Sequence, residues 1–185
     1  MAAQSVWYYT DLPEDIVEII ERDISQKFDW QMRESRLYGD EVDKERRNSE
    51  NTWIPTDHWL GGFVWHYVQR ANRENFQYDL SHLQREALQY ARYDKGMFYT
   101  WHTDFKKDDE EKLIRKLSFT LQLSSPDDYE GGNVQLLDEE GKSHIFPRKR
   151  GSICFFDSRL RHRVLKVKKG IRKSIVGWVA GPPWK

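Results

Sequence analysis

The chain has 185 residues, enough for one ordinary domain with a double-layered core and too few for two independent domains. Lysine plus arginine and aspartate plus glutamate each number 30, so the net charge gives no reason to expect a polyanion or an anionic membrane as partner. Cys154 is the single cysteine, which excludes an internal disulfide and suits a reducing compartment. The N-terminal segment lacks the pattern of a secretion signal and no stretch approaches membrane-spanning length, so a cytoplasmic protein is expected.

The first part of the chain predicts two helices separated by a charged segment. The first helix is expected to be capped by Thr10 or Asp11, with Pro13 near its first turn and isoleucines along one face. Residues 36–51 are charged and almost without large aliphatic side chains, so they are expected to form a loop or insertion. A second helix is expected over about residues 57–74.

From about residue 83 the pattern of apolar and polar residues changes to short alternating runs that predict strands. These runs are EALQYARY, MFYTWHTD, KLSFTLQLS, NVQLLD, SHIFP, SICFFD, HRVLKV and RKSIVGWVA, and turn residues divide them. About eight strands after two helices predict a mainly β fold with bracing helices, whose core is a double-stranded β-helix, also called a cupin-like jelly-roll. Residues 1–185 are expected to form one domain, with 1–82 mainly helical support and loop and 83–185 the jelly-roll core.

Basic residues cluster late in the chain. Eleven lysines and arginines fall between Arg148 and Lys173, and Asp157 is the only acid among them. Such a run is most often a solvated face. It would also favour an acidic substrate or one bound to RNA.

His102 and Asp104 are the first candidate metal ligands. Side chains at i and i+2 share one face of a strand, so these two can point at the same site. A second imidazole would complete the set of two histidines and one carboxylate that leaves positions open on non-haem iron(II). His162 is favoured because it follows an apolar strand and a turn that would return it beside this pair. The remaining histidines are alternatives for the third ligand: His58, His66, His82 and His144.

Arg172 lies in the strand that follows His162. In a strand, either Arg172 or its neighbour Lys173 must face inward, and an inward guanidinium needs an anion. Arg172 is favoured to bind the distal carboxylate of a dicarboxylic co-substrate whose 2-oxo acid end chelates the metal, with a hydroxyl contact from Ser174. The alternative places Arg172 on the surface with the basic cluster.

Several motifs, in order, resemble the iron(II)/2-oxoglutarate dioxygenases of the prolyl 4-hydroxylase type, in particular small microbial and viral members. They are YDKGMFYTWHTD, RKLSFTLQLS, DDYEGGNVQL, GSICFFDSRLRHRV and GIRKSIVGW, and the resemblance covers roughly residues 88–178. It implies an enzyme that uses Fe(II), 2-oxoglutarate and O2, with ascorbate as an accessory reductant, to hydroxylate an unactivated C–H bond and release succinate and CO2.

The resemblance also implies roles for single residues. His102, Asp104 and His162 match the metal ligands, and no catalytic side chain beyond them is implied. The co-substrate positions are matched by Arg172, Tyr93, Ser174 and Gln122. Gln122 is a departure, since several relatives carry a tyrosine there that touches the co-substrate.

On the substrate side, Tyr99 and Trp178 match aromatic residues beside the metal, and Arg115 matches an arginine that holds the substrate peptide. Core packing is the alternative for the two aromatics, and a solvated charge is the alternative for Arg115. The polar run from Phe105 to Lys116 is expected to form a lid over the substrate.

The expected substrate is a prolyl residue of a protein or peptide. This expectation rests on the resemblance, since the fold and the metal site do not determine the substrate. A nucleic-acid or small-molecule oxygenase of the same superfamily is the nearest alternative. Nucleic acid is disfavoured as a direct substrate because the strand after Arg172 lacks the second arginine expected there, and no aromatic and basic groove is evident. A non-catalytic cupin-like metal-binding module is the third reading. The hydroxylated position and the oligomeric state are left open.

Overall fold

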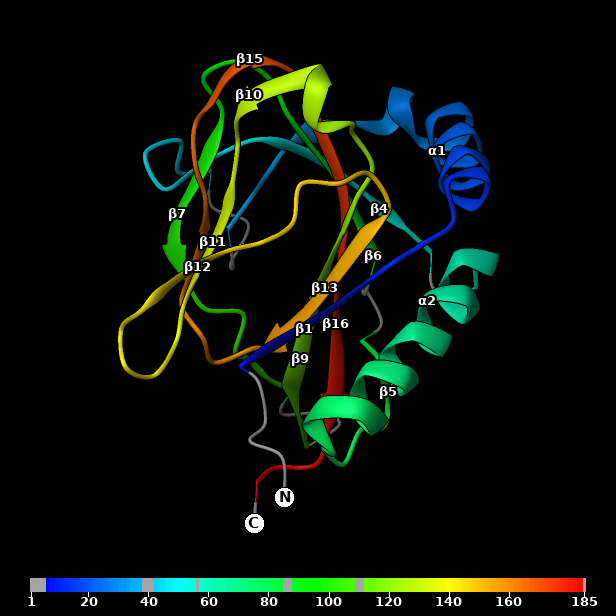
Figure 1. The fold of residues 1–185 in the computed structure, drawn as a ribbon, viewed down its shortest axis with the longest axis vertical. Coiled ribbons are helices and arrows are strands. Elements are labelled where there is room, and N and C mark those ends of the chain that lie inside the picture. The colour runs from blue at the N-terminus through cyan, green and yellow to red at the C-terminus, as the bar shows by residue number, and fades with distance from the viewer. Residues whose placement is uncertain (1–5, 38–41, 56, 85–87, 109–111, 185) are drawn as a thin grey trace.

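The structure is a computed structural model that describes residues 6–37, 42–55, 57–84, 88–108 and 112–184. It has the predicted mainly β fold, in which two antiparallel sheets face each other and both helices pack on the larger sheet (Figure 1). Neither helix among the described residues is long and apolar enough to span a membrane.

The larger sheet carries the order β1 (Trp7–Asp11), β13 (Ser152–Asp157), β9 (Leu113–Gln122), β16 (Arg172–Gly181), β6 (Leu88–Tyr93), β4 (Glu50–Ile54) and β2 (Arg33–Glu34), with β5 (His82–Leu83) paired to β16 and β8 (Lys107–Asp108) paired to β9. The smaller sheet has the order β12 (Ser143–Ile145), β11 (Val134–Leu137), β14 (His162–Val164), β7 (Phe98–His102) and β3 (Arg47–Asn48). A separate ribbon pairs β10 (Tyr129–Gly131) with β15 (Val167–Gly170). Non-sequential neighbours recur in both sheets, as a double-stranded β-helix requires.

The main core lies between the larger sheet and the helices α1 (Glu14–Phe28) and α2 (Trp59–Ala71). Short turns extend both helices, a 3-10 turn over Asp29–Gln31 and a π-helical turn over Asn72–Phe76; a further 3-10 turn covers Pro126–Asp128. Strand β9 shows the predicted alternation, because Leu117, Phe119 and Leu121 pack in this core. The other face of β9 therefore looks toward the smaller sheet, where the cavity described below is found.

The expected cap of the first helix is wrong. Pro13 is the N-cap of α1, and no side chain caps the helix. Thr10 and Asp11 belong to β1, where Asp11 pairs with Ser152 of β13. The Asp11 carboxylate accepts hydrogen bonds from Ser152 Oγ at 2.7 Å and Lys149 Nζ at 2.7 Å, so it is engaged across the sheet edge.

The loop expected over residues 36–51 is also partly wrong. Residues 38–41 lie outside the described residues, but β3 and the start of β4 fall in this segment and join the two sheets. Arg47 is buried although it is charged, because Gln89 Oε1 accepts from its Nη2 at 2.7 Å and Ser49 Oγ from its Nε at 3.1 Å. Satisfied polar groups, and not an apolar pattern, place this segment in the sheets.

The expected lid, residues 105–116, contains three residues, 109–111, that lie outside the described part. On either side of them, β8 pairs with the start of β9 through Lys107 opposite Ile114. The described part of this segment thus continues the larger sheet.

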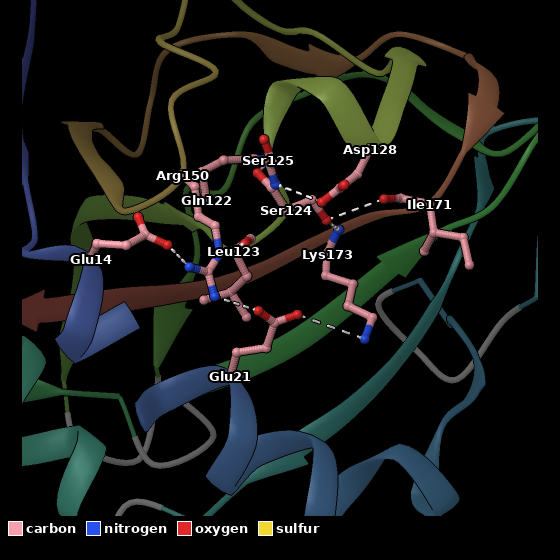
Figure 2. A network of polar contacts seen from close by, with 10 residues as sticks. All are labelled: Glu14, Glu21, Gln122, Leu123, Ser124, Ser125, Asp128, Arg150, Ile171 and Lys173. Carbon is pink, nitrogen blue, oxygen red and sulfur yellow. Dashed lines mark hydrogen bonds and ion pairs between the residues drawn. The ribbon is translucent and has the colours of Figure 1, made fainter. Parts of the chain in front are cut away.

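Polar contacts fasten α1 to the end of β9 (Figure 2). Arg150 donates from Nε to the carbonyl of Leu123 at 2.8 Å and from Nη2 to Glu21 Oε2 at 2.6 Å, and it also pairs with Glu14. Glu21 lies 4.0 Å from Lys173 Nζ. The network thereby joins the helix to the ends of the two strands, β9 and β16, that carry Gln122 and Arg172.

Candidate active site

Three side chains meet between the sheets at the position that the sequence predicts. His102 ends β7 and His162 begins β14, and the two are opposite each other in the strand pairing. Asp104 follows β7, and its backbone N–H donates to the carbonyl of Ser158 at 3.0 Å. Asp104 Oδ1 lies 3.8 Å from His102 Nε2, and Oδ2 lies 3.3 Å from His162 Nε2. One potential ligand atom from each residue falls within 4.8 Å of the others.

Backbone carbonyls orient both imidazoles. His102 Nδ1 is 2.8 Å from the carbonyl of Thr100, and His162 Nδ1 is 3.1 Å from that of Leu160. Since a carbonyl oxygen only accepts, the Nδ1 atoms carry the protons and the Nε2 lone pairs face Asp104. Tyr99 stacks on the His102 ring at 3.5 Å between centroids. This donor set is therefore preorganised for a metal ion.

The other histidines have different partners. His58 caps α2 by accepting from the N–H of Leu60, and His144 contacts Asp138 at 2.7 Å. His82 is in β5 and His66 is in α2. Among the residues that the structure describes, the group His102, Asp104 and His162 is the one cluster of three that could hold a metal.

The charges of the cluster also fit a divalent cation. Burial, with the neighbouring His162, lowers the pKa of His102 to about 3. Burial opposes ionisation of Asp104, but the two imidazoles outweigh it and hold the pKa of Asp104 far below its usual range. Burial likewise favours neutral His162, and Asp104 outweighs it and raises the pKa of His162. One ionised carboxylate beside imidazoles is the donor set of non-haem iron(II) sites.

A cavity of about 920 Å³ opens in front of these ligands and extends to Arg172. Arg172 faces inward, as predicted, and is 2% exposed, whereas Lys173 lies toward Glu21. Its Nη1 donates to Ser174 Oγ at 3.1 Å, and its guanidinium lies 5.6 Å from the centre of the Tyr93 ring. No described carboxylate pairs with Arg172, so this buried cation is suited to a carboxylate ligand.

Two further features fit a small polar ligand at the Arg172 end of the cavity. The hydroxyl of Thr120 is buried, lines the cavity and has no hydrogen-bond partner among the described residues. Gly132 has a φ of +63°, and a Cβ there would lie 3.3 Å from Arg172 Cδ and 3.1 Å from Tyr129 Cε2. Glycine thus allows the tyrosine and the guanidinium to approach each other.

Gln122 is buried, but its amide nitrogen already donates hydrogen bonds to protein groups. Nε2 lies 3.2 Å from the carbonyl of Ser124 and 3.1 Å from the hydroxyl of Tyr129. Tyr129, which was not predicted, is buried beside Gly132 with the Arg148 guanidinium 4.3 Å from its ring centre. The DDYEGG motif contains it, but only the fold places its ring beside Arg172.

The residues predicted for the substrate side all line the cavity. Tyr99 lies on the metal ligand His102, and the Arg115 guanidinium lies 4.2 Å from the centre of the Trp178 ring. Trp53, which sequence reasoning missed, is 6.0 Å from Trp178 between ring centres and 41% exposed. These side chains form an aromatic and cationic wall of the cavity.

Arg47 is a second missed residue of the cavity. Its guanidinium lies 4.9 Å from the centre of the Tyr99 ring, so the Tyr99 ring lies near both a cation and the His102 imidazole. Its hydrogen bonds go to neutral acceptors, and no described carboxylate pairs with it. Arg47 could have been predicted from the sequence only if the polar segment around it had been predicted as a strand.

Curated relatives share sequence with about half of the chain. A PKHD-type hydroxylase of Crocosphaera subtropica is 40% identical over 94 residues, which are 50% of this chain and 42% of the relative. A PKHD-type hydroxylase of Parvibaculum lavamentivorans is 36% identical over 89 residues, 48% of this chain and 39% of the relative. The matched region therefore spans about two fifths of these relatives' length.

Solved structures share the fold over nearly the whole chain. A Pseudomonas putida prolyl-4-hydroxylase has a TM-score of 0.74 at 22% identity, covering 94% of this chain and 91% of the other. A Trichoplax adhaerens prolyl hydroxylase, solved with a peptide of hypoxia inducible factor, has a TM-score of 0.77 at 17% identity, covering 94% and 83%. The collagen prolyl hydroxylase of Paramecium Bursaria Chlorella virus-1 has a TM-score of 0.68 at 19% identity, covering 96% and 97%.

The sequence model of the 2OG-Fe(II) oxygenase superfamily matches residues 88–180, half of the chain. This range contains β6 through β16 almost entirely, and with them His102, Asp104, His162 and Arg172. The family uses Fe(II), 2-oxoglutarate and O2, which agrees with the donor set and with the buried guanidinium. On its sequence, its fold and the placing of these four side chains, the chain belongs to the 2OG-Fe(II) oxygenase superfamily.

Proposed function

We propose that this protein is an Fe(II)- and 2-oxoglutarate-dependent dioxygenase that hydroxylates a prolyl residue in a protein or peptide. One observation carries the proposal: the cluster of His102, Asp104 and His162 faces the same cavity as Arg172, a buried guanidinium that pairs with no carboxylate of the described residues. A metal and a dicarboxylate can therefore be held in one enclosed space. The prolyl substrate is supported by the fold of the solved prolyl hydroxylases and by the aromatic wall of the cavity.

In this proposal the two Nε2 atoms and the Asp104 carboxylate would hold the iron. Arg172 and Ser174 would bind the distal carboxylate of 2-oxoglutarate, and the unpaired hydroxyl of Thr120 offers a further hydrogen bond. When bound, iron and 2-oxoglutarate supply the oxidising power that puts an oxygen atom of O2 into a C–H bond. The chain itself supplies position: fixed imidazoles at the metal and a fixed cation at the other end of the co-substrate.

The substrate would enter along the wall formed by Tyr99, Arg115 and Trp178. A pyrrolidine ring is apolar and compact, so it packs well against the faces of Tyr99 and Trp178. Arg115, held over the Trp178 ring, would contact the peptide backbone carbonyls beside it. The same aromatic side chains keep water away from the reacting C–H bond.

The chelate can be tested before any substrate is known. Fe(II) and 2-oxoglutarate, added without oxygen, should give the weak visible charge-transfer band of the chelate in wild type and none in His102→Ala. A band that persists in His102→Ala would contradict the ligand assignment. Arg172→Ala should require at least about tenfold more 2-oxoglutarate for half of the band, since a charged hydrogen bond contributes roughly 1.5–3 kcal/mol. Lys173→Ala is the matched control, and equal shifts in the two variants would contradict the role of Arg172.

The substrate is tested separately. Peptides and proteins that contain proline are screened aerobically, with and without ascorbate, for succinate release together with a mass gain of one oxygen on proline. Oxygen found on another residue, on a nucleotide or on a small molecule would replace the prolyl assignment and leave the chelate intact.

A further inference from the structure

The structure divides the late basic cluster into two groups. Five of its eleven cations form ion pairs with described residues of α1 or of the strands, and two more, Arg148 and Arg172, donate hydrogen bonds to Tyr129 and Ser174. Those seven are Lys149 with Asp11, Arg150 with Glu14 and Glu21, Arg159 with Asp157, Lys169 with Glu130, Lys173 with Glu21, Arg148 with Tyr129, and Arg172 in the cavity. The other four form no ion pair with any residue that the structure describes: Arg161, Arg163, Lys166 and Lys168.

Two of these unpaired cations, Arg161 and Arg163, lie on the outer side of the smaller sheet, and Lys166 follows the end of β14. Arg161 and Arg163 flank His162, and since His162 points into the cavity, its two neighbours point the opposite way. Their guanidinium carbons lie 5.8 Å and 4.5 Å from the centre of the Trp101 ring, next to His102 on β7. Lys166 Nζ lies 5.6 Å from the centre of the Phe98 ring.

We name Phe98, Trp101, Arg161, Arg163 and Lys166 the outer basic face. Arg161 and Lys166 are exposed, and the other three are half-buried. The sequence showed no aromatic and basic surface, because the aromatic residues and the cations are far apart in the chain and meet only where β7 pairs with β14. The face lies on the far side of the sheet from the metal ligands, so the proposed catalytic function makes no use of it.

We infer that the outer basic face binds single-stranded nucleic acid. Its cations can contact successive phosphates, and an arginine plane lying on an indole offers a flat surface on which an unpaired base stacks. The chain as a whole has no net charge, so the attraction comes from this local group and not from the molecule. The proposed ligand is a bound partner and not the hydroxylated substrate.

Single strands fit this face better than an acidic protein or a duplex does. A carboxylate-rich peptide would pair with the cations but would not use the faces of Trp101 and the arginines. In a duplex the faces of the bases are stacked on one another, so the aromatic residues of the outer basic face would again make no contact with them. The guanidinium of Arg163 is already held in a plane, by Trp101 and by a 2.7 Å hydrogen bond from its Nε to Gln135 Oε1, so less ordering remains to be done on binding.

Binding is measured by fluorescence anisotropy with labelled oligonucleotides of about twelve nucleotides, oligo(U) RNA and oligo(dT) DNA, at low salt. Saturable binding is expected for wild type. It should weaken at least about tenfold in Arg161→Gln/Arg163→Gln. The matched control is Lys27→Gln/Arg70→Gln, which removes the same charge from two exposed helical positions, 52% and 44% exposed, and should bind within about twofold of wild type. Equal loss in the two double variants, or no saturable binding by wild type, overturns the inference.

Salt dependence and competitors separate the alternatives. Loss of two phosphate contacts should reduce the slope of log K against log salt by about 1.4, since each contact to a single strand contributes about 0.7. Trp101→Leu should weaken binding without changing this slope, because it removes stacking and no charge. If that variant fails to fold, the arginine variants still decide. Displacement by poly-glutamate as readily as by unlabelled oligonucleotide overturns the inference in favour of an acidic protein partner. A preference between the RNA and DNA strands identifies which source the face takes.

Discussion

Tyr99 stacks on His102 with the two ring planes 14° apart. The phenol ring therefore contributes both to the predicted metal site, where it orients His102, and to the lining of the cavity. Burial raises the pKa of Tyr99 to about 12, so its hydroxyl stays neutral at any pH at which the enzyme would work.

Replacement of the ring should therefore affect the metal. We expect Tyr99→Ala to weaken binding of Mn(II), a stable substitute for Fe(II), by about tenfold, because the His102 imidazole loses the surface that orients it. Tyr99→Phe keeps the ring and should bind Mn(II) within about twofold of wild type. Isothermal titration calorimetry measures both. Similar losses in the two variants would mean that the hydroxyl, and not the stacked ring, supports His102.

Metal binding should depend on pH through His162. His102 has a pKa of about 3 and is neutral from pH 5 upward, whereas Asp104 raises the pKa of His162 above its ordinary value. Below that raised pKa a metal must displace one proton from His162, so log K should rise by about one per pH unit and then level off. Calorimetry in two buffers of different ionisation enthalpy counts the released protons. Release of two protons, or of none, would contradict this assignment.

Gly132 should control the co-substrate end of the cavity. A methyl group in Gly132→Ala would meet the side chains of Val167, Tyr129 and Arg172, so we expect the KM for 2-oxoglutarate to rise roughly five- to tenfold as the guanidinium moves. Gly141→Ala is a matched control, because Gly141 also has a positive φ, +80°, but has no atom within 4 Å of the added Cβ. That variant should lose stability alone. An unchanged KM in Gly132→Ala would show that Arg172 tolerates the shift.

Arg47 should act on the substrate and not on the co-substrate. It lies over Tyr99, while Arg172 lies beside Tyr93 and Ser174. We expect Arg47→Gln to raise the KM of a peptide substrate by about tenfold or more and to leave the KM for 2-oxoglutarate within about twofold. Steady-state kinetics with each reactant varied in turn checks this. The reverse pattern would place Arg47 at the co-substrate.

The Arg150 network should stabilise the fold. Its guanidinium donates to a backbone carbonyl and to Glu21 while its side chain is 18% exposed, so Arg150→Gln should lower the free energy of unfolding by about 1–3 kcal/mol. Lys149→Gln removes a neighbouring pair whose lysine is 69% exposed, and should cost about 0–1 kcal/mol. Urea unfolding measures both. Equal losses would mean that the network adds no more than a surface ion pair.

Local spacing explains why the metal ligands could be predicted. His102 and Asp104 are two residues apart, and His162 follows an apolar strand that returns. These signals left four other histidines open as the third residue, and the ordered motifs favoured His162. Alternation required that either Arg172 or Lys173 face inward, but it did not by itself decide which of them does. The order of strands in each sheet did not follow, because β7 pairs with β14 and β3 across long stretches of chain.

The missed residues share a physical cause. Arg47 is a buried polar side chain in a segment without an apolar pattern, and its hydrogen bond to Gln89, which is distant in sequence, helps to make burial possible. Tyr129 belongs to a ribbon whose geometry depends on glycines with positive φ. Thr10 and Asp11 are residue types that cap helices, but in the structure their backbone pairs with β13.

Both helices cover the larger sheet, and the smaller sheet carries no helix among the described elements (Figure 1). The two histidines thus lie on a single sheet whose outer face no described helix covers. Apolar contacts of Val164 and Leu136 join this sheet to the larger one, and a metal that joins β7 to β14 would add a further link between its strands. We expect the amide protons of these two strands to exchange with solvent faster than those of β9 and β16 in the metal-free protein, and to slow most when Mn(II) binds.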